Sequence, residues 1–354
     1  MTYTPHVVIE AEKIVNATIG IADQEMTLPK LFIRQGFDQF KGAKDDTLTY
    51  RIPGRLVPRK YAFRNNRANP IVFDTYKEAI TTITWGDRVY SGVKITDEQA
   101  EFDLDSPTCL QVVQGATVGR GLNTIMADAI EAAPYLFTIG GITNADGATA
   151  VRSATLEARK VLNKLGLPAA GRILVVGSNF EQAMLQEDKL ILASVVGDAI
   201  ASPALSDATN GKVNGFTVVT DQTIDADSAY ALLPSSFVLI TGAPYVPQSV
   251  GIGGTASYDG FAMRWMRDYD MEYLTDRSVV DTYAGVNYIN DIWLNPQQDI
   301  DEVQDITTVT ASVFVRGIKL TLDGSSTYPA SNTYVGGETG LTSGWVNPIA
   351  VVTP

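Results

Sequence analysis

Cysteine and histidine are nearly absent from this chain of 354 residues, which contains one of each. The single cysteine, Cys109, excludes internal disulfide bonds and zinc sites built from several thiolates. Any hydrolase triad or histidine-based metal site would have to use His6. We therefore expect a non-enzymatic protein without catalytic, cofactor-binding or metal-binding residues. Carboxylate chemistry is the one enzymatic alternative left open.

Long apolar runs are also missing, and positive charge is in the minority. The longest nearly apolar run, residues 190 to 196, is far shorter than the ~20 residues that cross a bilayer. The first residues lack the cationic and apolar stretches of a signal peptide, so we expect no membrane partner. The chain has 27 Lys and Arg against 40 Asp and Glu, a net charge of −13, which disfavours a protein that coats nucleic acid.

Positive charge is concentrated in residues 41 to 67. The segment holds eight cations and two aspartates, a net charge of +6, so the rest of the chain carries −19. The cations are Lys41, Lys44, Arg51, Arg55, Arg59, Lys60, Arg64 and Arg67. Strand patterns precede Pro53-Gly54 and return at residues 80 to 85 and 89 to 95, where every second residue shares one face. The pattern predicts a long two-stranded β-hairpin with a cationic, turn-rich tip.

An isolated hairpin is only marginally stable in water, so another surface is expected to cover this one. The alternatives are the acidic surface of a neighbouring copy, nucleic acid, and solvent alone. Interleaved Tyr50, Tyr61 and Phe63 would suit stacked bases. The charge of −19 on the rest of the chain favours the neighbouring copy.

Acidic side chains suited to such a contact occur near residue 270. Asp268, Asp270 and Glu272 alternate along a strand predicted at residues 261 to 273, so they would share one face. A second strand is predicted at residues 278 to 289. The three carboxylates predict a solvated acidic strip or a contact for cations of another copy. A divalent-metal site or an acid–base pair is the alternative.

A long helix is predicted between Pro107 and Pro134, with apolar residues at intervals of three and four. Three glycines interrupt it: Gly115, Gly119 and Gly121. Each would weaken an isolated helix by roughly 1 kcal/mol. Such glycines are expected where another backbone approaches closely or where the helix bends.

Helix and strand patterns alternate from residue 149 to 241, which predicts a small α/β domain around a covered sheet. The predicted elements are a helix at 151–165, a strand at 172–176, a helix opened by a capping box of Ser178 and Glu181, and strands at 215–219 and 237–241. Residues 137 to 149 predict a loop. Residues 294 to 306 predict a linker to an appendage with strand patterns at 307–315 and 318–322.

Four local strings add a resemblance to a known family. They are Val93-Lys94-Ile95-Thr96-Asp97-Glu98-Gln99, Arg172-Ile173-Leu174-Val175-Val176-Gly177-Ser178 with Phe180-Glu181, Ala243-Pro244-Tyr245-Val246-Pro247, and Asp276-Arg277-Ser278-Val279-Val280-Asp281-Thr282-Tyr283-Ala284-Gly285. In their order, and with the hairpin and long helix, they resemble the major capsid proteins of tailed double-stranded-DNA bacteriophages of the Hong Kong 97 type, in particular a podophage coat-like subgroup. The resemblance covers roughly residues 1 to 293.

The resemblance implies an α+β fold with an N-terminal arm, an extended hairpin loop, a spine helix, an axial α/β domain, peripheral-domain strands and a β-rich C-terminal extension. The implied boundaries are 1–40 for the arm, 41–100 for the extended loop and return strand, 101–145 for the spine helix, 146–243 for the axial domain, 244–293 for returning strands and 294–354 for the extension.

The function implied is that of a structural protein of the virion, assembled in the host cytoplasm as hexamers and pentamers of an icosahedral shell around phage DNA. Further copies of the chain are the expected partners, with scaffolding, portal and decoration proteins and non-specifically bound DNA at the inner face. An encapsulin-like nanocompartment shell is the alternative. The residues expected at the contact between copies are Arg51, Arg55, Arg59, Lys60, Arg64, Arg67, Asp268, Asp270 and Glu272.

Overall fold

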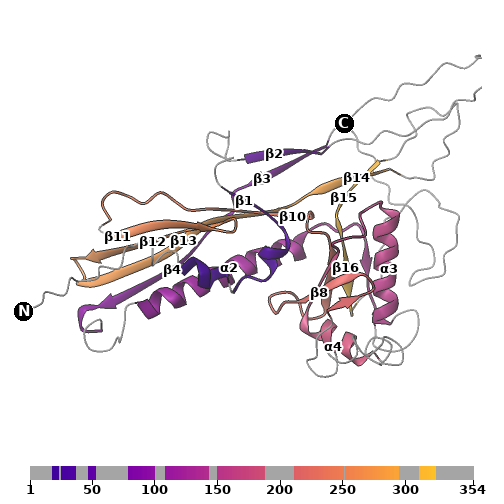
Figure 1. The fold of residues 1–354 in the computed structure, drawn as a ribbon, viewed down its shortest axis with the longest axis horizontal. Coiled ribbons are helices and arrows are strands. Elements are labelled where there is room, and N and C mark those ends of the chain that lie inside the picture. The colour runs from indigo at the N-terminus through magenta and orange to yellow at the C-terminus, as the bar shows by residue number, and fades with distance from the viewer. Residues whose placement is uncertain are drawn as a thin grey trace, which may run out of the picture. The chain divides into compact units, whose positions relative to one another are not determined.

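The computed structural model describes residues 18–23, 25–36, 47–52, 79–99, 108–142, 150–187, 211–250, 252–294 and 311–323, which Figure 1 draws as coloured ribbon. These residues belong to two units. Unit 1 takes its residues from 1–48, 82–129 and 237–287, and unit 2 from 49–81, 130–236 and 288–354. Most of the cationic hairpin tip lies outside the described residues, including Arg55, Arg59, Lys60, Arg64 and Arg67.

Unit 1 is built on a six-stranded sheet. Its strands follow the order β1 (Ile33–Gly36), β10 (Phe237–Gly242), β13 (Thr275–Tyr288), β12 (Phe261–Asp270) and β11 (Ile252–Tyr258), and β4 (Asp87–Thr96) also pairs with β13. The β1–β10 pair is parallel, whereas β11–β12, β12–β13 and β13–β4 are antiparallel. A short 3₁₀ helix, η1 (Leu28–Leu31), precedes β1.

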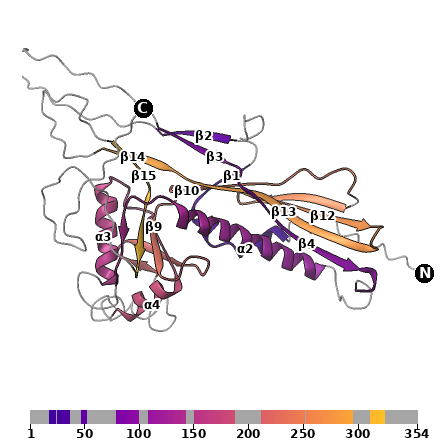
Figure 2. The same ribbon diagram turned by 180° about the vertical axis from the view of Figure 1, so that it is seen from behind.

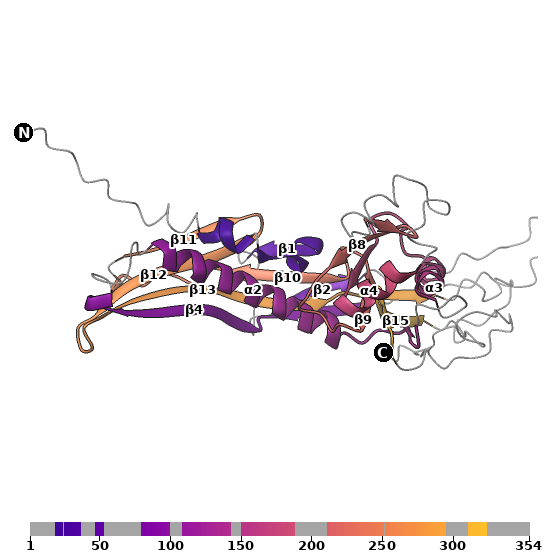
Figure 3. The same ribbon diagram turned by 90° about the horizontal axis from the view of Figure 1, so that it is seen from below.

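The predicted alternation along β4 is confirmed. Residues 89, 91, 93 and 95 are half-buried, and the residues between them are exposed. The half-buried face meets α2 (Thr108–Ala132), the predicted long helix, which lies along one face of the sheet (Figure 3). Gln114 on α2 donates hydrogen bonds from Nε2 to the carbonyls of Ser91 and Ser278, at 3.3 and 2.9 Å. The strand alternates because α2 covers one of its faces.

Two of the three glycines of α2 lie where another backbone approaches, as predicted, whereas a Cβ on Gly121 would meet the side chain of Val89 at 2.7 Å. A Cβ on Gly115 would lie 2.8 Å from the carbonyl oxygen of Thr18, and one on Gly119 would lie 2.5 Å from that of Ala22. Residues 18–23 are helical, so this N-terminal helical turn rests directly on the backbone of α2. Any side chain at the two glycines would push the segments apart.

Unit 2 contains a second six-stranded sheet, with two helices. The strand order is β5 (Thr138–Ile139), β16 (Gly317–Thr321), β9 (Ser228–Leu232), β6 (Ile173–Val176), β8 (Phe216–Thr220) and β7 (Lys212–Val213). The helices α3 (Val151–Lys164) and α4 (Ser178–Gln186) contact β16 and β9 respectively and contact each other, so they cover the same face (Figure 2). The apolar core of this unit lies between the helices and the sheet.

Two further pairs of strands complete the described structure. β2 (Thr47–Ile52) pairs with β3 (Ala79–Thr84), which confirms a two-stranded hairpin that returns near residues 80 to 85. The stretch at 89 to 95, predicted as part of the same returning limb, lies in β4 and pairs with β13 in the sheet of unit 1 instead. β14 (Asn290–Leu294) pairs antiparallel with β15 (Ala311–Val315). The predicted boundary at residue 294 therefore falls at the end of a paired strand.

Three sequence predictions about the α/β region are wrong because strand partners come from distant parts of the chain. The strand predicted at 237–241 in the α/β domain is β10, which joins the sheet of unit 1. β16, predicted in a separate appendage, lies between β5 and β9 inside the sheet of unit 2. The loop predicted at 137–149 contains β5, which pairs in parallel with β16.

The predicted capping box of Ser178 and Glu181 is also wrong. Gly177 is the N-cap of α4 and makes no side-chain capping bond. The carbonyl of Ala226 accepts hydrogen bonds from two free N–H groups in the first turn of the helix, those of Asn179 and Phe180, at 3.0 and 3.1 Å. A backbone group from another loop thus replaces the expected side-chain cap.

Candidate subunit-contact surface

The acidic strip predicted on β12 is partly confirmed in its geometry. Asp268 and Asp270 lie on one face of the strand, because they are two residues apart. β12 ends at Asp270, however, and Glu272 lies in the turn of residues 271–274. The backbone N–H of Glu272 donates to Asp270 Oδ1 at 3.1 Å, a local side-chain bond of the kind that ends strands. Glu272 therefore does not continue the face.

One arginine of the neighbouring strand lies against both carboxylates. Arg277 on β13 is the direct cross-strand partner of Asp268. Its Nη2 lies 3.4 Å from Asp268 Oδ2, and its Nη1 lies 3.2 Å from Asp270 Oδ2. Two carboxylates share one guanidinium, so this part of the strip keeps negative charge, and Asp268 remains half exposed.

The turn that joins β12 to β13 exposes large apolar side chains. Met271, Tyr273 and Leu274 are 84%, 66% and 62% exposed. Leu274 has a φ of +49°, a left-handed conformation that glycine or asparagine normally occupies. Turns usually use small polar residues. The subunit therefore carries backbone strain at Leu274 and exposes apolar surface here, although the Lys94 ammonium lies over the ring of Tyr273, 5.6 Å from its centroid.

Polar contacts at the end of β4 extend this surface. The Tyr269 hydroxyl donates to Asp97 Oδ2 at 2.8 Å, and this bond is the main reason that the pKa of Tyr269 is raised. Thr96 and Gln99 exchange side-chain-to-backbone bonds at 3.3 and 3.4 Å in a reciprocal capping box. A hydrogen bond to its own backbone N–H lowers the pKa of Glu98. The region is acidic and solvent-facing.

The predicted cationic partners are mostly outside the described residues. Arg51 lies on β2 and is exposed. Five of the predicted cations lie outside the described residues: Arg55, Arg59, Lys60, Arg64 and Arg67. The contact between these cations and the acidic strip of another copy stays a prediction.

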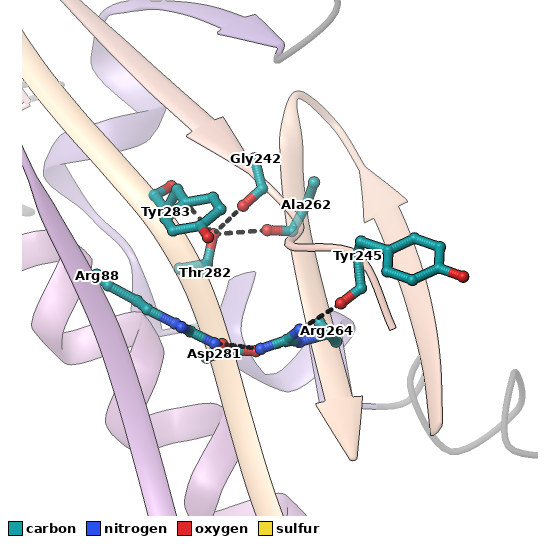
Figure 4. Close-up of polar contacts among 8 residues, drawn as sticks. All are labelled: Arg88, Gly242, Tyr245, Ala262, Arg264, Asp281, Thr282 and Tyr283. Carbon is teal, nitrogen blue, oxygen red and sulfur yellow. Dashed lines mark hydrogen bonds and ion pairs between the residues drawn. The ribbon is translucent and has the colours of Figure 1, made fainter. Parts of the chain in front are cut away.

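The strongest charged cluster of unit 1 was missed by sequence reasoning (Figure 4). Asp281 on β13 is completely buried, and Arg264 on β12 is nearly so. Arg264 donates from Nε to Asp281 Oδ1 at 2.9 Å and from Nη2 to Oδ2 at 2.6 Å. Arg88 on β4 donates from Nε to the same Oδ2 at 2.7 Å. One carboxylate thus joins three neighbouring strands.

The described part of the chain contains no cluster of metal-binding side chains. Among those residues, no group of three or more His, Cys, Asp or Glu side chains is placed to hold a metal ion. Within the same residues, no helix is long and apolar enough to cross a membrane. The charged and apolar features gather on strands and a turn, as in a protein that binds through its surface.

The arrangement of a hairpin, a spine helix along one sheet and an α/β unit defines an α+β capsid fold of the Hong Kong 97 type. The chain belongs to the phage capsid protein family, whose model matches residues 78 to 278, more than half of the chain. Membership makes it a structural, major capsid protein of a bacteriophage that associates with copies of itself in the viral capsid. No curated protein matches the chain.

Solved structures share this fold at low sequence identity. A protein of Mycobacterium phage Che8 is 14% identical, with a TM-score of 0.58 over 85% of this chain and 92% of that one. The capsid of cyanophage P-SCSP1u gives 13% identity, a TM-score of 0.56 and coverage of 83% and 87%. The mature capsid of bacteriophage PhiM1 gives 13% identity, a TM-score of 0.55 and coverage of 84% and 87%.

Proposed function

We propose that this capsid protein forms the hexamers and pentamers of an icosahedral shell that encloses a double-stranded DNA genome. The observation that carries the proposal is the family match, which spans β4, α2, the core of the α/β sheet and β12. Assembly takes place in the host cytoplasm, with scaffolding and portal proteins as further partners and with DNA bound non-specifically at the inner face. The protein has no catalytic role.

The surface around the β12–β13 turn is the proposed contact with a neighbouring copy. It combines the negative charge left by Asp268, Asp270 and Glu272 with the exposed side chains of Met271 and Tyr273. The cationic segment 41–67, with its net charge of +6, is the complementary part of another copy. Opposite charges steer such contacts, and the apolar residues supply area that is buried only on assembly.

The domain assignment follows the same proposal. Residues 1–40 form the N-terminal arm, 41–100 the extended loop, 101–145 the spine-helix region, 146–243 the axial domain, 244–293 the returning strands and 294–354 the extension. The pairing of the strands differs from this proposed division at two places, because β10 belongs with the sheet of unit 1 and β16 with the sheet of unit 2.

Electron microscopy of the purified full chain tests the function. We expect closed particles with hexamer and pentamer outlines, formed alone or with a co-expressed scaffolding protein. Deletion of residues 53–78, which leaves β2 and β3 in place, should give folded subunits that fail to close. Normal shells from the deletion would contradict the proposed role of the hairpin tip.

The contents of the particles separate the two kinds of shell. Particles with double-stranded DNA recovered from infected cells support the phage coat. Particles that enclose an enzyme and no DNA would instead establish the nanocompartment alternative.

A further inference from the structure

Residues 82–88 join the hairpin to the sheet. Hydrogen bonds, close backbone packing, an aromatic pair and an ion pair hold this segment along β13. We name this segment the hairpin root. The side-chain amide of Asn287 donates to the carbonyl of Thr82. The backbone N–H of Gly86 donates to the carbonyl of Ala284 at 3.2 Å. Together with the antiparallel pairing of Asp87 and Arg88 with Ala284 and Tyr283, these two bonds hold the backbone of the root along β13.

Close packing fixes the middle of the root. A Cβ on Gly285 would lie 2.8 Å from the carbonyl oxygen of Thr84, so only glycine allows the two backbones to approach this closely. The rings of Trp85 and Tyr283 meet edge to face, with centroids 6.0 Å apart and planes at 64°. Aromatic pairs of this geometry are favourable beyond the area that they bury.

Arg88 is the last contact of the root and the only one that reaches the buried ion cluster. Its guanidinium lies over the ring of Tyr283, 5.6 Å from the centroid, and donates to Asp281 Oδ2 (Figure 4). Asp281 in turn holds Arg264, whose Nη1 donates to the carbonyl of Tyr245. A continuous chain of charged hydrogen bonds therefore runs from the root through β13 and β12 to the segment that follows β10.

Neutralisation of Asp281 does not require Arg88. Arg264 already binds both oxygens of the carboxylate, at 2.9 and 2.6 Å, in the paired geometry that satisfies such a group. Arg88 adds a second positive charge to the same oxygen, and its side chain is 45% exposed. Because Arg264 already pairs with Asp281, the additional bond from Arg88 serves mainly to hold β4, the strand that carries Arg88, in place.

The geometry points to Arg88 as a positioning residue for assembly: through Asp281 it holds the hairpin root on β13, and the root in turn restricts the freedom of the hairpin that assembly uses. The inference rests on the proposed function, in which the hairpin contacts another copy. A loose root lowers the fraction of subunits whose hairpin is ready to bind, and assembly weakens accordingly although the subunit is folded.

The test is Arg88→Gln, which leaves Asp281 bound to Arg264 and so avoids an unpaired buried charge. In the unassembled subunit we expect hydrogen exchange of the amides of residues 82–88 to rise about tenfold, because charge-assisted bonds that hold them are lost. We also expect fewer closed shells by sedimentation and electron microscopy, with the melting temperature of the subunit nearly unchanged.

Arg267→Gln is the matched control. Arg267 also pairs with an aspartate of β13, Asp276, but it contacts no residue of the root in the structure described. In this variant, hydrogen exchange of the amides of the root and the yield of closed shells should equal those of the wild type. Wild-type exchange and normal shells from Arg88→Gln would overturn the inference, and so would equal effects of the two variants.

Two outcomes keep this inference separate from the proposed function. Failure of the wild-type chain to form shells under any condition would reject the function, whereas wild-type shells with an unaffected Arg88→Gln would reject only the role of Arg88. Arg88→Lys keeps the positive charge but has one donor group, the ammonium, for Asp281 Oδ2. Should the Gln variant fail to fold, hydrogen exchange of the root and the yield of closed shells are measured on Arg88→Lys instead.

Discussion

At the scale of single residues, burial decides how much a charge matters to the subunit. Asp281→Asn removes the carboxylate that pairs with the buried Arg264. Breaking a buried ion pair from one side usually costs about 3–5 kcal/mol. We expect a loss of that order in the free energy of unfolding, measured by urea denaturation. Asp276→Asn, at the more exposed pair with Arg267, should cost about 1 kcal/mol or less. Equal losses would contradict this ranking.

Two buried tyrosines of unit 2 are expected to lower the stability of the folded protein at alkaline pH. Burial raises the pKa of Tyr230 from its ordinary 10.0 to about 12, with the charge of Glu131 adding to the effect. Burial also raises the pKa of Tyr135 well above its usual value, and the rings of the two residues lie 5.5 Å apart. In the unfolded chain both ionise near pH 10, which favours unfolding at higher pH.

The stability that these tyrosines contribute is therefore complete below pH 10 and falls as the pH rises toward their raised pKa values in the folded protein, about 12 for Tyr230. Ultraviolet absorbance of tyrosinate, followed together with circular dichroism, should show both groups ionising as unit 2 unfolds. Tyr230→Phe removes one ionisation and should weaken the pH dependence between pH 10 and 12. Ionisation of both near pH 10 in the folded protein would contradict the prediction.

The sequence did not reveal Asp281 because its local pattern is ambiguous. Val280 faces the core beneath α2, so its neighbour Asp281 is expected on the opposite, solvated face. The structure covers that face with two arginine side chains, from β12 and β4. Such cover depends on strand register between distant segments. The shared face of Asp268 and Asp270 was easier to predict, since alternation along one strand is a local property of the sequence.

At the scale of elements, two glycines in helical segments should respond in opposite ways to alanine. Gly119→Ala places a Cβ 2.5 Å from the carbonyl oxygen of Ala22 and should destabilise unit 1, although alanine favours a helix by about 1 kcal/mol. A Cβ on Gly20 meets nothing within 4 Å, so Gly20→Ala should be neutral or stabilising by up to about 1 kcal/mol. Thermal denaturation measures both. A stabilising Gly119→Ala would show that the contact is not tight.

The elements that sequence predicted best are those that depend on local signals. The long helix α2 and the helix α3 follow from periodic apolar residues with breakers at their ends, and β6 from a continuous apolar run. The sheet membership of β10 and β16 could not be predicted in this way, since their partners lie far away in the sequence. The cap of α4 failed for the same reason, because a carbonyl from another loop replaces the side chain.

At the scale of the whole molecule, a coat protein must be judged by contacts that a single chain does not make. The β12–β13 turn is unfavourable in the isolated subunit, with exposed Met271 and Tyr273 and a left-handed Leu274. Evolution of a stable monomer would favour small polar residues in the turn. A turn that lowers the stability of the subunit and exposes apolar area is expected where that area becomes buried between copies on assembly.

Leu274→Asn separates these two contributions. Asparagine tolerates the left-handed conformation, so the isolated subunit should gain about 1 kcal/mol in the free energy of unfolding. The same change removes apolar area that the proposed contact would bury, so the yield of closed shells should fall. Asp259→Asn, in the other left-handed turn of this sheet, should change both quantities little, because it alters only an exposed ion pair with Arg34. A variant that is both more stable and fully able to assemble would show that the turn lies outside every contact between copies, and the acidic strip beside it would lose its proposed role.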